Sequence, residues 1–219
     1  MSSQAEILSR FSGEGSGDPF YLPDLTLWYD WHQSRGTLPR AWANLSLPQI
    51  ARAMGVPIWL PVRPWRVETP GVEIVTTERD GERNICCETP AGPLVARWAQ
   101  GPDGDWWQTE YPVKNAGDLA AALDLARARS YVPDLTLLAE AVASLGDEGI
   151  VALEIPRRPY SDLLHEFLGW REGLMLLSEP AVDEILAILE HKLQDLVRSV
   201  AALSGALVFS PDNLDGQFI

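Results

Sequence analysis

The sequence predicts an α/β protein whose strands and helices alternate around a parallel sheet, with an antiparallel β-meander inserted into it. Two short apolar runs, at 56–62 and 149–156, lack polar alternation, which is typical of parallel strands buried on both faces. In the second half of the chain such runs alternate with helix-favouring segments, as βα units do. Residues 65–111 differ, because they contain strand-like runs separated by turn signals.

Composition narrows the classes of function. The chain has 219 residues, 46% of them hydrophobic, which is enough for one large domain or two small ones with a substantial core. Its 17 basic and 31 acidic residues give a net charge of −14, which argues against binding to nucleic acid or to a membrane surface. No apolar run is as long as a membrane span. Cys86 and Cys87 are adjacent and would point to opposite faces of a strand, so we expect no disulfide and a cytoplasmic location.

The amino-terminal region is expected to hold a flexible lead-in followed by the domain itself. Residues 1–20 end in a stretch rich in Gly, Ser and Pro, and the domain is expected to span 21–219. β-Favouring residues between turn-forming residues predict a strand over 24–32. A helix is expected to begin after Ser46 and to end at Gly55.

The meander at 65–111 is expected to contain about four antiparallel strands. Asp80 and Gly81 form a strong hairpin signal, and Ala91 and Gly92 mark another corner. A third turn is predicted at Gly-Pro-Asp-Gly. The alternation of the strands predicts one apolar and one polar face.

After the meander the pattern becomes helical. The long last helix has the clearest apolar face, and a final short strand follows it over 206–210. Helices are predicted over 116–130, 133–146, 160–169, 170–178 and 179–205.

Nine tryptophans are unusual for this length, and eight of them lie in the segments 28–65 and 98–107. Clustered tryptophans indicate large buried aromatic surfaces, which serve either as core packing or as pocket walls.

Polar residues near the expected strand ends are the candidate site residues, because βα units gather functional side chains there. Asp30, His32 and Arg35 are close in sequence; Arg can clamp a carboxylate, and His can transfer a proton near neutral pH. The alternative is a solvated loop with a local ion pair. Arg63 follows an apolar run and therefore needs a partner, which is Glu68, another internal acid or a bound anion.

The segment after the strand at 149–156 is the strongest candidate for an anion site. Arg157 and Arg158 follow that strand directly and precede a helix, whose amino terminus favours anions. His165 on that helix is either a functional residue or a packed one. Asp212 in the last loop could accept hydrogen bonds, with ordinary turn chemistry as the alternative.

Common motifs for cofactors and metals are missing from the sequence. It has no glycine-rich phosphate loop, no nucleophile elbow and no zinc-protease helix. The two cysteines have no further ligand at metal-binding spacing. The residues themselves therefore predict no metal site and no cofactor.

Four segments together resemble the uroporphyrinogen decarboxylase superfamily, which also contains corrinoid- and thiol-dependent methyltransferases. LWYDWHQSRGTLP is similar to the family's first-strand motif, with Gln33, Leu38 and Pro39 in register. CETPAG with the later YPVKNAGDL, and also SPDNLDGQFI, are similar to segments of methyltransferase-like members. IPRRPYSDLLHEFLG resembles a Gly-x-Pro-Trp-Thr segment. The resemblance spans residues 22–219.

The resemblance implies a (β/α)8 barrel, of which this chain is the amino-terminal portion, with 65–111 inserted after the second strand. It implies a pocket for a tetrapyrrole, a corrinoid or a methyl donor, and a carboxy-lyase or methyltransferase activity that this portion alone would not show. Binding of such a ligand without turnover is the alternative. Zinc is expected only if a carboxyl-terminal half supplies its ligands. The expected partners are the small-molecule ligand and a second copy of the chain in a homodimer.

The resemblance also suggests roles for single residues. His32 stands where the decarboxylases have a substrate-binding Arg, and His165 falls at or near the position of their pocket Tyr. Their central Asp is missing, with Arg63 close by, so decarboxylation of the usual kind is not expected. The expected catalytic residues are Asp30, His32 and His165. The expected substrate-binding residues are Arg35, Arg63, Arg158, Tyr160 and Asp212.

Overall fold

The computed structural model divides the chain into two compact units, which are described separately. The first unit comprises Met1–Pro64, Asp134–Glu154 and Val200–Phe209, and the second comprises Trp65–Pro133, Ile155–Ser199 and Ser210–Ile219. The residues that the structure describes are 4–14, 19–102, 104–171, 173–201 and 207–211.

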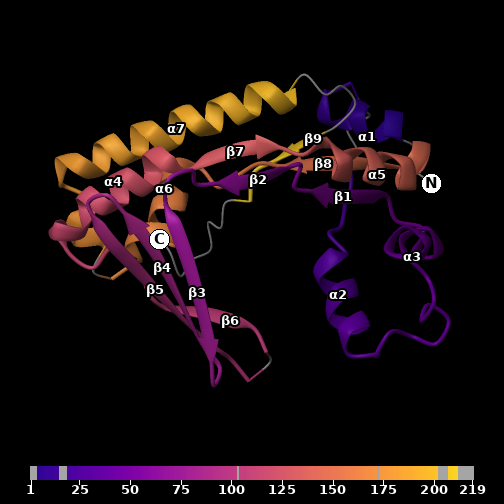
Figure 1. The fold of residues 1–219 in the computed structure, drawn as a ribbon. Helices are drawn as coiled ribbons and strands as arrows, with labels where there is room; N and C mark the ends of the chain where they lie inside the picture. The colour runs from indigo at the N-terminus through magenta and orange to yellow at the C-terminus, as the bar shows by residue number, and fades with distance from the viewer. Residues whose placement is uncertain (1–3, 15–18, 103, 172, 202–206, 212–219) are drawn as a thin grey trace. The chain divides into compact units, whose positions relative to one another are not determined.

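A three-stranded parallel sheet forms the centre of the first unit (Figure 1). Its order is β1 (Ile58–Val62), β8 (Gly149–Glu154) and β9 (Leu207–Phe209), and both pairings are parallel. The first five residues of β8 are buried, as expected for a strand with neighbours on both sides. The predicted parallel sheet is therefore confirmed.

Three helices of the first unit pack against this sheet. Helix α5 (Leu135–Leu145) contacts β8 and β1, α3 (Leu47–Met54) contacts β1, and α1 (Gln4–Phe11) contacts β8. The prediction of a loop-like lead-in is wrong for Gln4–Phe11, because Ile7 is fully buried and anchors α1.

The strand predicted over 24–32 is a helix, α2 (Thr26–Ser34). Asp24 starts it, because its Oδ1 accepts hydrogen bonds from the amide and the hydroxyl of Thr26. Trp28 and His32 are four residues apart and their rings lie together, which is helical spacing. The prediction failed because Trp, Tyr and Leu favour a pleated surface only where a neighbouring strand is available.

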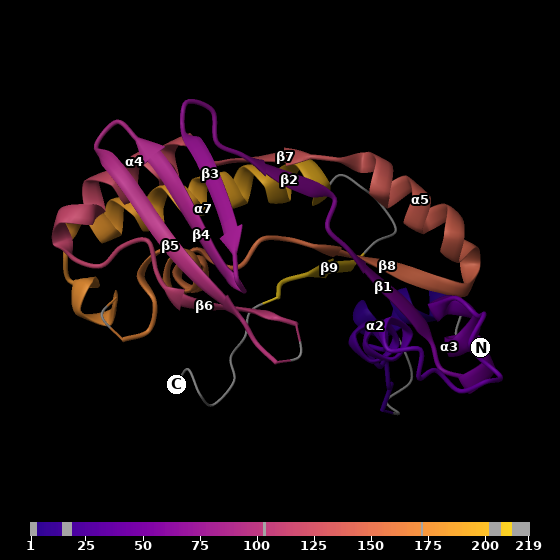
Figure 2. The same cartoon turned by 60° about the horizontal axis from the view of Figure 1, so that its bottom comes forward.

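The second unit contains the predicted meander. Strands β3 (Glu73–Arg79), β4 (Glu82–Thr89), β5 (Gly92–Gln100) and β6 (Trp106–Glu110) pair antiparallel in this order (Figure 2). Asp80 and Gly81 both have positive φ, as a two-residue hairpin turn requires. Residues 65–68 are not part of this sheet, because β2 (Trp65–Glu68) pairs with β7 (Ser130–Pro133), a strand that the sequence did not predict.

Helices cover the apolar face of the meander and form the core of the second unit. Helix α4 (Leu119–Ala128) packs against β4 and β5, and α7 (Pro180–Ala201) lies alongside α4 (Figure 1). Arg127 on α4 forms an ion pair of 2.6 Å with Glu184 on α7. The other helical segments are η1 (Ala116–Asp118), α6 (Pro159–Asp162), the π-helix η3 (Leu163–Leu168) and the 3-10 segment η4 (Gly173–Leu176); a further one, η2 (Gly146–Glu148), belongs to the first unit.

The α/β class is thus confirmed, and the sheets of the described residues remain open: none of the three closes into a barrel. Within the same residues, no helix is both long enough and apolar enough to cross a membrane.

Candidate functional site

Three of the expected site residues lie on or beside α2 and not at a strand end. The His32 ring lies against the rings of Trp28 and Trp31, with centroid distances of 5.0 and 4.7 Å, and its Nδ1 is 2.8 Å from Thr37 Oγ1. The Arg35 guanidinium stacks on Trp31, 4.7 Å from the ring centroid. Asp30 is exposed on the same helix. The reason for expecting these residues at the mouth of a sheet was therefore wrong, because the segment is helical.

Arg63 lies at the end of β1, as predicted, and its partner is an internal acid. Its Nη2 and Nε donate to Glu154 Oε1 at 2.5 and 3.2 Å. The two residues meet because Val62 and Leu153 are register partners on neighbouring parallel strands. The partner of Arg63 is therefore Glu154, an internal acid. It is not Glu68, which pairs with Arg66 at 2.7 Å.

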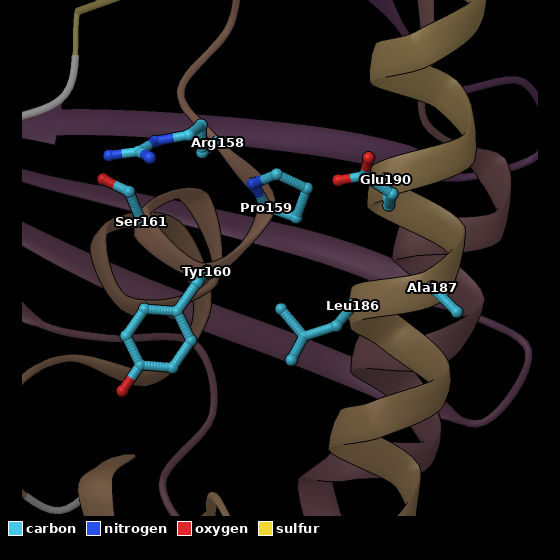
Figure 3. Close-up of a pocket in the computed structure, with 7 residues that line it drawn as sticks. All are labelled: Arg158, Pro159, Tyr160, Ser161, Leu186, Ala187 and Glu190. Carbon is cyan, nitrogen blue, oxygen red and sulfur yellow. The ribbon is translucent and has the colours of Figure 1, made fainter.

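Arg158 and Tyr160 do come together, in a cleft that we call the α6–α7 cleft. It has a volume of about 560 Å³ and lies within the second unit. Figure 3 shows the Arg158 guanidinium and the Ser161 hydroxyl on one side, with helix α7 on the other. The residues that line it are Arg158, Pro159, Tyr160, Ser161, Leu186, Ala187 and Glu190.

Local backbone chemistry places Arg158 at this cleft. Pro159 is the first residue of α6, and a proline restricts the preceding residue to extended backbone. Arg158 accordingly has φ −60° and ψ 149°, which turns the chain into the helix. Since α6 has only four α-helical residues, the side chains and not a helix dipole must provide the binding chemistry.

The last two expected residues are not part of this cleft. His165 lies in η3, where its ring is 5.5 Å from the Trp170 ring at nearly a right angle, and it is not among the residues that line the cleft. Asp212 lies outside the described residues.

A buried ion pair in the second unit was not foreseen from the sequence. Arg129 Nη1 donates to Asp162 Oδ2 at 2.9 Å, and the two side chains are only 14% and 9% exposed. The guanidinium also lies over the Phe167 ring, 5.0 Å from its centroid. Lys192 Nζ donates to the main-chain oxygens of Arg127 and Arg129. A carboxylate directly before the apolar pair Leu163-Leu164 was the one signal available.

Burial changes the protonation behaviour of this cluster. Loss of solvent raises the pKa of Asp162 to about 6, because the nearby Arg129 only partly offsets it and Glu166 adds repulsion. Burial likewise raises the pKa of Tyr131 to about 12. For Lys192, burial and then the charge of Arg129 lower the pKa.

The raised pKa of Asp162 predicts a pH dependence of stability. Because the folded-state pKa of about 6 exceeds the ordinary value of 3.8, folding binds a proton between these values. The contribution of protonated Asp162 to the unfolding free energy is fully present below about pH 4 and is lost as the pH rises through 6. Compared with Asp162→Asn, the wild type should lose about 3 kcal/mol of unfolding free energy between pH 4 and 7. Urea denaturation of both proteins across this range checks it, and a constant difference would contradict it.

Among the described residues, no three or more His, Cys, Asp or Glu side chains lie together in a way that could hold a metal ion. Cys86 and Cys87 are both free thiols. They lie on opposite faces of β4, with Cys87 packed on the core and Cys86 Sγ 3.3 Å from Glu88 Oε1. Burial raises the pKa of the Cys87 thiol, which makes it a poor nucleophile at neutral pH.

Comparison of the chain with family models, with curated proteins and with solved structures gives no match.

Proposed function

We propose that this chain is a uroporphyrinogen decarboxylase-like protein and that its parallel sheet is part of a (β/α)8 barrel. The support is the sequence resemblance together with three parallel strands in the order β1-β8-β9, with α5 packed on β8 and β1. Parallel strands joined through helical crossovers are the repeating unit of such a barrel. The meander then is an insertion between barrel strands.

The ligand proposed is a carboxylate-rich tetrapyrrole or a related molecule, bound in the α6–α7 cleft. One observation carries this: the cleft combines an exposed guanidinium, two hydroxyl groups and an apolar wall. Arg158 would bind a carboxylate bidentately, with Ser161 and Tyr160 as further donors. Leu186 and Ala187 offer the apolar surface that a pyrrole ring needs.

Glu190 adds the complementary charge on the opposite side of the cleft. It lies on α7, and its Oε1 accepts a hydrogen bond of 2.7 Å from Gln194 Nε2, which holds the carboxylate in place. A carboxylate is an acceptor, so it suits pyrrole N–H groups while Arg158 suits their carboxylate substituents. Neither Asp30 nor His32 nor His165 lines the cleft, so binding, and not turnover, is the function that this geometry supports best.

Titration of uroporphyrin III with the protein, followed by fluorescence anisotropy, tests the proposal. Replacement of Arg158 by Ala removes charge-assisted hydrogen bonds and should weaken binding by about 10-fold to 100-fold. Arg79→Ala is the matched control, because Arg79 is equally charged, 92% exposed and located at the tip of the hairpin. Equal affinity of the Arg158→Ala protein and the wild type would overturn the proposal.

A further inference from the structure

A second cavity in the second unit lies on the apolar face of the meander. It has a volume of about 310 Å³, at the lower end of the range for small-molecule sites. Its walls come from strands β2 to β6 and from Leu125 on α4 (Figure 2 shows these strands). Most of the wall is apolar, including Ile85, Leu94 and Ala96, whereas Arg129 and Glu166 form a charged end.

Two hydrogen-bond donors on the residues that line this cavity are unsatisfied. Trp98 Nε1 and Arg129 Nε are both buried, and within the described part of the chain neither has an acceptor. A buried donor without a partner lowers the stability of the fold, so such atoms require an explanation. The other end of the guanidinium is already engaged, because Arg129 Nη1 binds Asp162.

The charges around Arg129 favour an anion at this end of the cavity. Asp162 binds Arg129 at 2.9 Å, and Glu166 pairs with Arg157 at 3.3 Å. Lys192 adds a third positive charge, held by the main-chain oxygens of residues 127 and 129. The cluster therefore has three cations and two carboxylates, of which only Arg129 and Glu166 line the cavity, and one negative charge would balance it.

We propose that this cavity binds an apolar monocarboxylic acid, with its chain against the meander and its carboxylate at Arg129. The carboxylate supplies the acceptor that Arg129 Nε lacks, and the chain covers Ile85, Leu94 and Ala96. The cavity shares no lining residue with the α6–α7 cleft, so this site stands or falls independently of the proposed function.

Calorimetric titration of the intact chain with octanoate tests the site, with two matched variants. Thr76 lines the cavity, and its neighbour Thr77 points to the opposite face of β3, because their partners are Ile85 and Asn84. Both threonines are exposed, so tryptophan at either position leaves the core intact. We expect the wild type and Thr77→Trp to bind octanoate alike, and Thr76→Trp to bind it at least 10-fold more weakly.

Octanol, which has the same chain without the charge, tests the role of Arg129. We expect it to bind at least 10-fold more weakly than octanoate. Absence of octanoate binding to the wild type, or equal affinity of the Thr76→Trp and Thr77→Trp proteins, would overturn the site. Octanol binding as tight as that of octanoate would overturn the assignment of the carboxylate to Arg129.

Discussion

Replacement of Asp162 by leucine is expected to lower the unfolding free energy by about 3–5 kcal/mol, because Arg129 would keep its charge without its buried partner. Asp162 is 9% exposed and is bound to Arg129 Nη1 at 2.9 Å. Burial lowers the pKa of Arg129 and Asp162 raises it; once Asp162 is removed the guanidinium still keeps its proton at neutral pH, because arginine is not deprotonated in proteins. Urea denaturation at pH 7 measures the effect.

Two further variants separate loss of the pair from loss of packing. The double variant Arg129→Met/Asp162→Leu removes both charges and should recover most of the lost stability, since apolar residues of similar size replace buried ion pairs well. Asp195→Leu is the control, because Asp195 pairs with Arg198 at 2.8 Å while 56% exposed, and such pairs contribute about 0–1 kcal/mol. Equal losses in Asp162→Leu and Asp195→Leu would refute the interpretation.

Replacement of Gly169 by alanine is expected to cost about 4 kcal/mol of unfolding free energy. Gly169 ends η3 with φ 73° and ψ 174°, a conformation that only glycine adopts readily, which accounts for about 2 kcal/mol. A Cβ atom there would also overlap the Tyr111 ring, at 2.7 Å from its Cε2, and overpacking of this kind costs about 2 kcal/mol more.

The two contributions can be measured apart. In a Tyr111→Ala background, Gly169→Ala should cost only the backbone share of about 2 kcal/mol. Gly71→Ala is the control for backbone strain alone, because Gly71 has φ 79° and no atom within 4 Å of the added Cβ. If the cost of Gly169→Ala were the same in both backgrounds, overlap with Tyr111 would not be its cause.

Much of the fold could be predicted from local pattern. The apolar runs at 56–62 and 149–156 became parallel strands, and Asp80-Gly81 became a hairpin turn. Turn chemistry and burial on both faces act over a few residues, so they are visible in sequence. The sequence did not predict helix α2, because its aromatic residues also favour strands and the sequence does not show whether a neighbouring strand is present.

The candidate site was predictable only in part. Arg158 and Tyr160 were expected to bind a ligand and do line one cleft, because both lie at the same chain reversal around Pro159. The other wall, with Leu186 and Glu190, comes from α7 and could not be assigned from sequence. Asp30, His32 and Arg35 were expected to meet at the end of a strand, but that segment is helix α2. The three residues are close only because they lie on or beside this helix.

By itself, the sequence determined the α/β class, the meander and the long last helix, because each follows from periodicity and turn residues within a short segment. Only the tertiary structure decided which charged groups are neighbours. Arg63 meets Glu154 and Arg129 meets Asp162 across 91 and 33 residues of chain. Such partners are set by the register of strands and the packing of helices, and burial then raises the pKa of Asp162. No local pattern carries that information.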